Sequence, residues 1–161
     1  MYRRMLNRAA MVLLIALLSD WASAQMMPNP YGLPVNLETA KKAAAAAVDE
    51  ARKNNWNVAV AIVDNNGDLI YFERMDNTQI GSIKVAQEKA RTAALFKRPS
   101  KSFEDAVAAG RNAVLRLPGV TPVEGGIPLL MDGKIVGAIG VSGALSAQDA
   151  QCAKAGVETL K

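Results

Sequence analysis

Apolar residues recur along this chain at two spacings, one typical of helices and one of strands. Over residues 37–51 they return every three or four positions, and most of them are alanine. This pattern predicts a helix that can lie close to whatever it packs against. Residues 79–97 predict a second alanine-faced helix. A third, shorter helix is expected from Ser100 or Ser102, either of which can cap it, to about Ala109.

Two segments have the length and composition of β-hairpins. Asn66-Gly67 is typical of a type I′ turn, and Asp132-Gly133 has the same character. Pro128 has no N–H to give to a ladder, so its strand is predicted either to lie at an edge of the sheet or to begin after a bulge. The apolar runs that these turns join are 58–63 with 69–75, and 127–131 with 135–141.

The order of these elements is α-β-β-α-α-β-β-α, with a last helix capped by Ser146 and an irregular stretch over 111–123. We therefore predict an α/β (α+β) fold, in which helices cover one antiparallel sheet of two hairpins. The second hairpin is rich in glycine, which weakens a strand unless another backbone approaches closely. We expect this hairpin to run close to an alanine-faced helix, with Gly125 and Gly126 lining a small cleft or a subunit contact. A plain bulge is the alternative.

The N-terminus has the three parts of a secretory signal peptide. Three arginines precede an apolar run over 9–18, and Ala22-Ser23-Ala24 is typical of a cleavage site. We therefore expect residues 1–24 to be removed and the protein to be periplasmic or secreted, with no membrane span in the mature chain. An uncleaved anchor is the alternative. Residues 25–36 contain three prolines and predict an extended, mobile lead-in to a domain over 37–161.

Charge and cysteine content narrow the classes of partner. The formal charge of +4 falls to +2 when three arginines and one aspartate leave with the leader. So small a charge gives no indication of nucleic-acid binding. Cys152, the single cysteine, leaves a buried thiol or a bridge between subunits as alternatives. Because alanine buries little area, we expect a homo-oligomer to add burial.

The chain contains no histidine, which excludes Ser-His and Cys-His nucleophilic machinery and the commonest zinc and haem ligand. No catalytic residue is assigned. Four carboxylates lie around the first hairpin: Asp64, Asp68, Glu73 and Asp76. A solvated surface is the favoured interpretation, with turn chemistry for the first two, and a weak metal site is the alternative. In the segment 88–100, "EKARTAALFKRPS", Arg91 shares a helix face with Lys84.

The segments "KARTAALFKRPS", "GGIPLLMDGKIVGAIGVSG" and "QDAQCAKAGVETL" together resemble the GlcG/HbpS-type haem-binding family, also called haem-degrading. This family is related to the C-terminal domain of PduO-type proteins. The resemblance covers about 37–161. It implies a profilin-like domain that forms dimers and larger rings. It also implies that some members are exported and bind haem, and that one branch works beside a sensor protein.

The resemblance also indicates where a ligand would lie. The expected binding residues are Arg91, Thr92 and Arg98, with Gly125 and Gly126 as a backbone wall. Without histidine, an iron ligand would be a methionine, tyrosine, cysteine or threonine, and the donors considered are Tyr71, Met75, Thr92 and Met131. Lys84, Arg91 and Arg98 could pair with haem propionates.

These observations favour an exported, oligomeric protein that binds haem, a related tetrapyrrole or another small ligand, for sensing or storage. One alternative is an enzyme that degrades haem oxidatively, or that acts on a small hydroxy or keto acid held by Arg91 and Arg98. Another alternative is a structural assembly module without a ligand.

Overall fold

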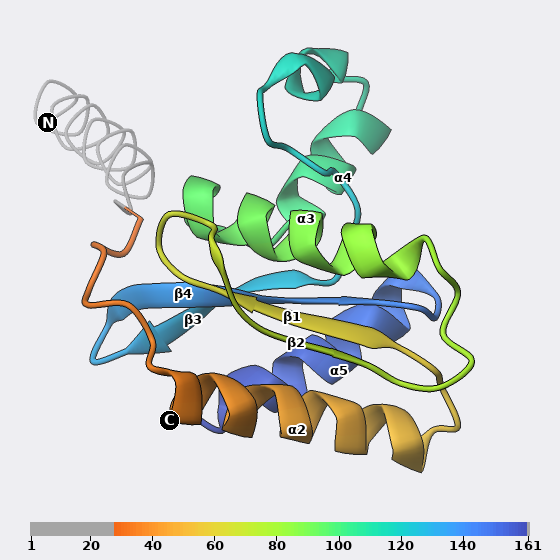
Figure 1. Ribbon diagram of the computed structural model, residues 1–161. Coiled ribbons are helices and arrows are strands. Elements are labelled where there is room, and N and C mark those ends of the chain that lie inside the picture. The colour runs from red at the N-terminus through yellow and green to blue at the C-terminus, as the bar shows by residue number, and fades with distance from the viewer. Residues whose placement is uncertain (1–27, 161) are drawn as a thin grey trace, which may run out of the picture.

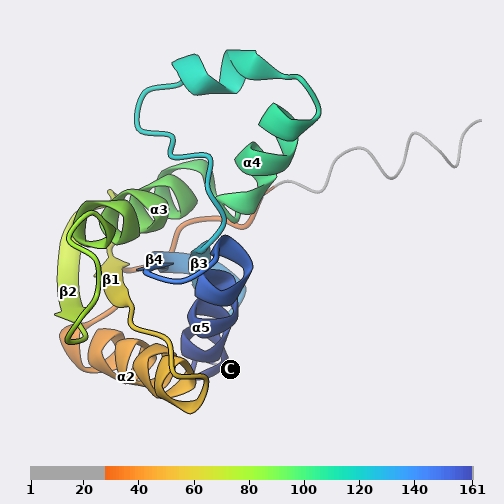
Figure 2. The same ribbon diagram turned by 90° about the vertical axis from the view of Figure 1, so that its right-hand side faces the viewer.

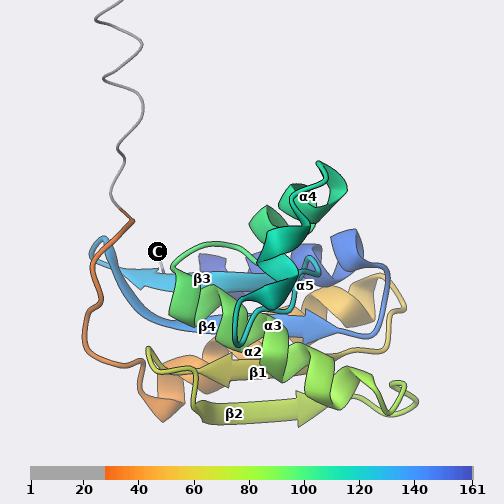
Figure 3. The same ribbon diagram turned by 90° about the horizontal axis from the view of Figure 1, so that it is seen from above.

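The computed structural model describes residues 28–160, and one antiparallel sheet lies at its centre (Figure 1). The strands are β1 (Ala59–Val63), β2 (Leu69–Arg74), β3 (Gly126–Met131) and β4 (Lys134–Ser142). They lie side by side in the order β2-β1-β4-β3, as the view from above shows (Figure 3). β3 is therefore an edge strand, which confirms the prediction made from Pro128.

Helices cover both faces of the sheet. Helix α3 (Ser82–Phe96) covers one face, and helices α2 (Leu37–Lys53) and α5 (Ser146–Glu158) cover the other (Figure 2). Helix α4 (Lys101–Ala108) and the short 3₁₀ helix η1 (Asn112–Arg116) extend away from the sheet beyond α3. This arrangement confirms the predicted fold class and element order. The predicted signal peptide and residues 25–27 lie outside the described residues.

The strands alternate between two cores because successive side chains point to opposite faces of a sheet. Val58, Val60 and Ile62 face α2 and α5, together with Leu129 and other large side chains. Ala59, Ala61 and Val63 face α3, whose buried side is alanine as predicted. The α2–α5 face therefore contains most of the bulky apolar side chains, and the α3 face contains small ones.

Glycines on β3 and β4 bring the sheet into direct contact with α3. A Cβ atom built on Gly140 would lie 2.1 Å from the Ala86 carbonyl oxygen, and one on Gly126 would lie 2.1 Å from the Lys89 carbonyl oxygen. No side chain fits such a gap, so the backbones of strand and helix touch. The glycine-rich hairpin thus lies against an alanine-faced helix, as the sequence indicated.

The two hairpin turns differ. Asp132 and Gly133 both have positive φ, 49° and 70°, as a type I′ turn requires. In the first hairpin only Gly67 has positive φ, 81°, so the predicted type I′ turn at Asn66-Gly67 is wrong. The Asp64 side chain instead accepts hydrogen bonds from the Asn66 and Asp68 N–H groups, which stabilises a longer turn.

The described part of the lead-in forms backbone hydrogen bonds with β4, and its mobility stays a prediction. Gly32 N–H donates to the Ile135 carbonyl at 2.7 Å, and Val35 N–H donates to the Val136 carbonyl at 2.7 Å. The segment 28–36 is extended, but it lies beside β4 past the end of β1. Asn36 then caps α2 by accepting from Thr39 N–H at 2.8 Å, which confirms that cap.

Three local expectations are corrected. The Ser100 hydroxyl does not cap α4; it donates to the Val123 carbonyl and accepts from Gly126 N–H, fixing the start of β3. Ser146 is the first residue of α5, and the Gln148 side chain accepts the Leu145 N–H there. The stretch 111–123, expected to be irregular, contains η1. Tertiary contacts decide these details, because several polar groups compete for each one.

Candidate functional site

An apolar groove of about 310 Å³ runs beside β3, and we call it the edge-strand groove. The N-terminal segment, the α3–α4 junction, the β3–β4 hairpin and the end of α5 all contribute to it. Its lining includes Pro28, Lys97, Pro99, Ile127, Leu130 and Val157. Lys97 is the one charged residue in this lining. The volume falls at the lower end of small-molecule sites, about 300–1,000 Å³.

Tyr31 contacts the end of α3 and the groove residue Lys97. Its hydroxyl donates to the carbonyls of Ala94 and Leu95 at 2.8 and 3.2 Å, and these belong to the last turn of α3. Carbonyls at a helix end lack partners within the helix, so the phenol satisfies them. Burial raises the pKa of Tyr31, which keeps the hydroxyl a donor. The Lys97 ammonium lies 4.1 Å from the centre of the Tyr31 ring.

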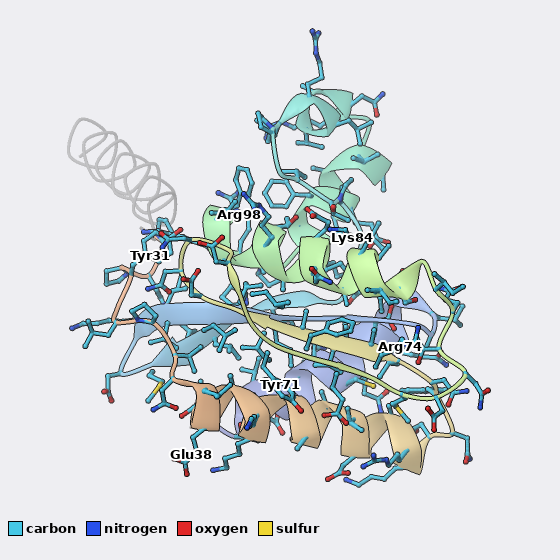
Figure 4. The ribbon with its side chains drawn as sticks, viewed as in Figure 1. Tyr31, Glu38, Tyr71, Arg74, Lys84 and Arg98 are labelled. Atoms are coloured by element: carbon cyan, nitrogen blue, oxygen red, sulfur yellow. The ribbon has the colours of Figure 1, made fainter. Side chains whose placement is uncertain are left out.

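Lys97 and Arg98 place two cations where α3 ends. Lys97 has a left-handed backbone, φ 55°, and the chain turns there. Arg98 Nε donates to the Phe96 carbonyl at 3.1 Å, and its guanidinium lies 5.5 Å from the centre of the Phe103 ring. Figure 4 shows Arg98 at this end of α3, on the same side as Tyr31. Lys97 lines the groove, where a carboxylate could form a charge-assisted hydrogen bond with it, and Arg98 is the next residue in the chain but is not part of the lining.

The other predicted residues of α3 have different environments. Thr92 is fully buried; its hydroxyl donates to the Gly119 carbonyl at 3.2 Å and accepts from Thr121 N–H at 2.8 Å. It therefore holds the loop that follows η1. Arg91 is exposed, and its side chain packs against Gly67 of the first hairpin. Lys84 is exposed toward the opposite end of α3 from Arg98 (Figure 4).

Gly125 and Gly126 are buried between the sheet and α3 and are not part of the edge-strand groove lining. A Cβ atom on Gly125 would lie 2.7 Å from the Val141 carbonyl oxygen and 2.9 Å from Lys89 Nζ. The glycines thus allow the Lys89 side chain to pass beside the start of β3. Their role as a wall of a ligand site stays a prediction.

The remaining predicted residues lie on the other side of the sheet. Tyr71 and Met75 pack against the core that faces α2 and α5, and the Tyr71 hydroxyl donates to Glu73 at 3.1 Å. Figure 4 shows Tyr71 on the α2 side and Arg98 on the α3 side. Met131 lines a separate groove near the start of α2. Within one copy of the chain, the sheet separates the predicted binding residues into two groups.

Comparison with known proteins shows to which family this chain belongs. The family model described as "Haem degrading protein HbpS-like" matches residues 35–158. The chain belongs to this HbpS-like family. Protein GlcG of Escherichia coli K12 is 47% identical to it over 98 residues, which are 61% of this chain and 73% of GlcG.

Solved structures agree with this assignment. A double mutant of Streptomyces reticuli HbpS has a TM-score of 0.75 at 34% identity, covering 86% of this chain and 95% of that one. A PduOC–haem complex has a TM-score of 0.72 at 27% identity, covering 80% of this chain and 96% of that one. The resemblance seen in the sequence is therefore confirmed.

In this HbpS-like chain a buried ion pair connects α3 to α5, and the sequence analysis missed it. Lys89 Nζ lies 2.8 Å from Asp149 Oδ2 and also donates to the Val141 carbonyl at 3.1 Å; both side chains are 2% exposed. Asp149 Oδ1 accepts from Ala144 N–H. Burial raises the pKa of Asp149, and the Lys89 ammonium opposes that shift. A lysine within the alanine stripe of α3 was the available signal.

Haem fits part of the edge-strand groove of this HbpS-like chain. The apolar side chains of the lining suit the porphyrin ring, and the ammonium of Lys97 in the lining suits a propionate. Among residues 28–160 no three His, Cys, Asp or Glu side chains form a metal-binding group, and none of the methionine and tyrosine donors considered above lines this groove. Cys152 is buried, and burial raises its pKa to about 12, so its thiol stays protonated.

Among residues 28–160, no helix has the length and hydropathy to cross a membrane.

Proposed function

We propose that this protein binds haem or a related tetrapyrrole, with the edge-strand groove holding the ring and Lys97 and Arg98 holding its propionates. The observation that carries the proposal is an apolar groove with the Lys97 cation in its lining and Arg98 next to Lys97 in the chain. A flat apolar ring with two carboxylates needs both features. The similarity to a PduOC–haem complex supports the same ligand class. Arg98 comes from the predicted binding set, and Lys97 is new.

We also propose that the protein works as a homo-oligomer. A groove of about 310 Å³ covers only part of a haem, so a second copy would complete the site. Several large apolar side chains lie on the surface, including Leu33 at 87% and Ile80 at 81% exposed. These side chains offer exposed apolar area that a second copy could cover.

Export to the periplasm or the medium is the third part of the proposal, and the leader pattern in residues 1–24 supports it. An exported haem protein would store haem or report it to a sensor protein. Mass determination of the protein from the periplasmic fraction should give a chain that begins at Gln25. A chain that still begins at Met1 would contradict export by cleavage.

Titration of the mature chain with hemin tests the binding proposal. We expect a saturable shift of the Soret band. A double variant Lys97→Gln, Arg98→Gln should bind about a hundredfold to ten-thousandfold more weakly, because it removes two charge-assisted hydrogen bonds that contribute about 1.5–3 kcal/mol each. Lys84→Gln is the matched control, since Lys84 is an exposed cation on the same helix but far from the groove.

A titration without spectral change would overturn haem binding. If Lys84→Gln or Arg91→Gln weakens hemin binding more than the Lys97, Arg98 double variant does, the ligand lies elsewhere on α3. Sedimentation with and without hemin reports the oligomer, and a monomer in both states would contradict the shared site.

Oxidative haem degradation is the second candidate, favoured by the description of the matching family. Oxygen and an added reductant would supply the oxidant and the electrons. Progressive loss of the Soret band with release of iron would show turnover. A stable spectrum under the same conditions would show binding without degradation. The small-acid enzyme and the assembly module stay predictions without a supporting contact.

A further inference from the structure

A further groove, of about 440 Å³, lies at the opposite end of the sheet from the β3–β4 turn, and its lining is rich in side-chain amides. We call it the amide groove, and it is defined by Asn55, Trp56, Asn57, Asn77, Gln79 and Gln148. None of the described residues that line it carries a charge. In a chain with 21% charged residues, a neutral polar groove of this size is a distinct chemical environment.

Three of the amides are free to bind a ligand. Within residues 28–160 the side chains of Asn55, Asn57 and Asn77 make no hydrogen bond, and all three residues are exposed. The other two amides are held in place. Gln79 Nε2 donates to the Ser82 hydroxyl at 3.0 Å, and the Gln148 carbonyl oxygen accepts from Leu145 N–H at 3.1 Å. Each free carboxamide offers one acceptor and two N–H donors.

Trp56 supplies an aromatic surface among these amides. It is half-buried and packs against the core that faces α2 and α5. Its indole N–H has no partner in the described part of the chain. Tryptophan with a fixed body and an open polar edge is typical of recognition surfaces.

Unusual backbone conformations bring the three contributing loops together. Asn55 and Asn77 are two of the four described non-glycine residues with positive φ, at 58° and 63°. Gly143 has φ 150°, and a Cβ atom there would lie 2.2 Å from the Asn57 carbonyl oxygen. Backbone of this kind clusters at functional sites, where the surroundings hold it in place.

We propose that the amide groove binds a neutral saccharide. Sugar hydroxyls both donate and accept, as carboxamides do, so each free asparagine can pair with them in either sense. The C–H face of a sugar ring suits an indole surface. A charged ligand gains no ion pair here. The site is independent of the edge-strand groove and of the haem proposal.

Intrinsic fluorescence gives a direct test, because Trp21 belongs to the predicted leader and Trp56 is the sole tryptophan of the chain from Gln25. The probes are maltotriose and the trimer of N-acetylglucosamine. We expect at least one to shift the Trp56 emission saturably. Asn57→Ala and Asn77→Gly should each weaken that binding about threefold to tenfold, the effect of one lost hydrogen bond. Glycine at position 77 keeps the positive φ.

Asn112→Ala is the matched control, because Asn112 is an exposed asparagine on η1, outside the amide groove. It should leave saccharide binding unchanged. The proposal is overturned if neither sugar changes the fluorescence. It is also overturned if Asn57→Ala and Asn77→Gly leave saccharide binding intact. A capped neutral tripeptide that shifts Trp56 while neither sugar does would overturn it too, since the groove would then be a peptide site. Circular dichroism of each variant excludes unfolding as the cause.

Discussion

On the α3 face of the sheet, helix and strand meet backbone to backbone, whereas on the α2–α5 face large side chains separate them. Gly126 and Gly140 leave no room for a methyl group beneath α3. Across the sheet, Ile62, Leu129 and Ile139 fill the space toward α2 and α5. The contact between α3 and the sheet therefore depends on the fit of individual atoms. The contact on the α2–α5 face depends on the total volume of the side chains that fill it. Substitutions should therefore affect the two faces differently.

The largest effect is expected from Gly140→Ala. Its new methyl carbon would lie about 2.1 Å from the Ala86 carbonyl oxygen and close to the Ala90 backbone. Since both backbones are fixed by hydrogen bonds, neither can retreat. We expect a loss above about 5 kcal/mol, comparable with the whole stability of many domains. Urea unfolding followed by circular dichroism should then show no cooperative transition.

Gly81→Ala is the matched control, because no atom lies within 4 Å of a Cβ placed there and its φ is −58°. It should change the free energy of unfolding by less than about 0.5 kcal/mol. If Gly140→Ala is equally mild, the close contact between α3 and β4 does not exist.

The next largest effect should come from Lys89→Met. This substitution leaves the Asp149 carboxylate buried without its partner, which costs about 3–5 kcal/mol in comparable ion pairs. The double variant Lys89→Met, Asp149→Leu should recover most of this loss, because it removes both buried charges. Denaturant unfolding of the four proteins of this cycle gives the coupling energy. If the double variant loses as much free energy of unfolding as the two single variants lose together, the two side chains do not interact.

Leu129→Ala tests the volume-filling α2–α5 face. Leu129 is fully buried there, and the deletion should lower the free energy of unfolding by about 2–5 kcal/mol through lost burial and a cavity. Leu129→Met, which conserves volume, should cost less than about 1.5 kcal/mol. The protein should fold in both cases, unlike Gly140→Ala. Equal losses for Ala and Met would mean that volume is not what this face requires.

The smallest effect is expected at Cys152, whose thiol reports whether solvent reaches the core on the α2–α5 face. Burial raises its pKa from 9.0 to about 12. The folded thiol therefore keeps its proton between these values while the unfolded one loses it, and this stabilisation declines as pH rises from 9 toward 12. A thiol reagent should label Cys152 at pH 8 only after denaturant is added. Rapid labelling of the native protein would show that the Cys152 sulfur is accessible. A dimer that a reductant separates would show the same.

The element order, the edge position of β3 and the close approach of α3 to glycine-rich strands could all be predicted, because each depends on local spacing or on one residue's geometry. The candidate sites could not. Tyr71 and Arg98 have suitable chemistry but lie on opposite sides of the sheet. Lys97 and Tyr31 drew no attention because their contact joins residues far apart in sequence. The asparagines of the amide groove come from separate loops, and only the folded chain brings them together.

Residue spacing by itself determined which segments are helices and strands and which side of each is small or bulky, since those patterns repeat within a few residues. The tertiary structure alone decided that residues 28–36 lie beside β4, that Lys89 meets Asp149, and that two chemically different grooves form. The physical reason is that these features depend on where loops and helix ends meet in space. That meeting is set by the packing of the whole domain, which no single stretch of sequence encodes.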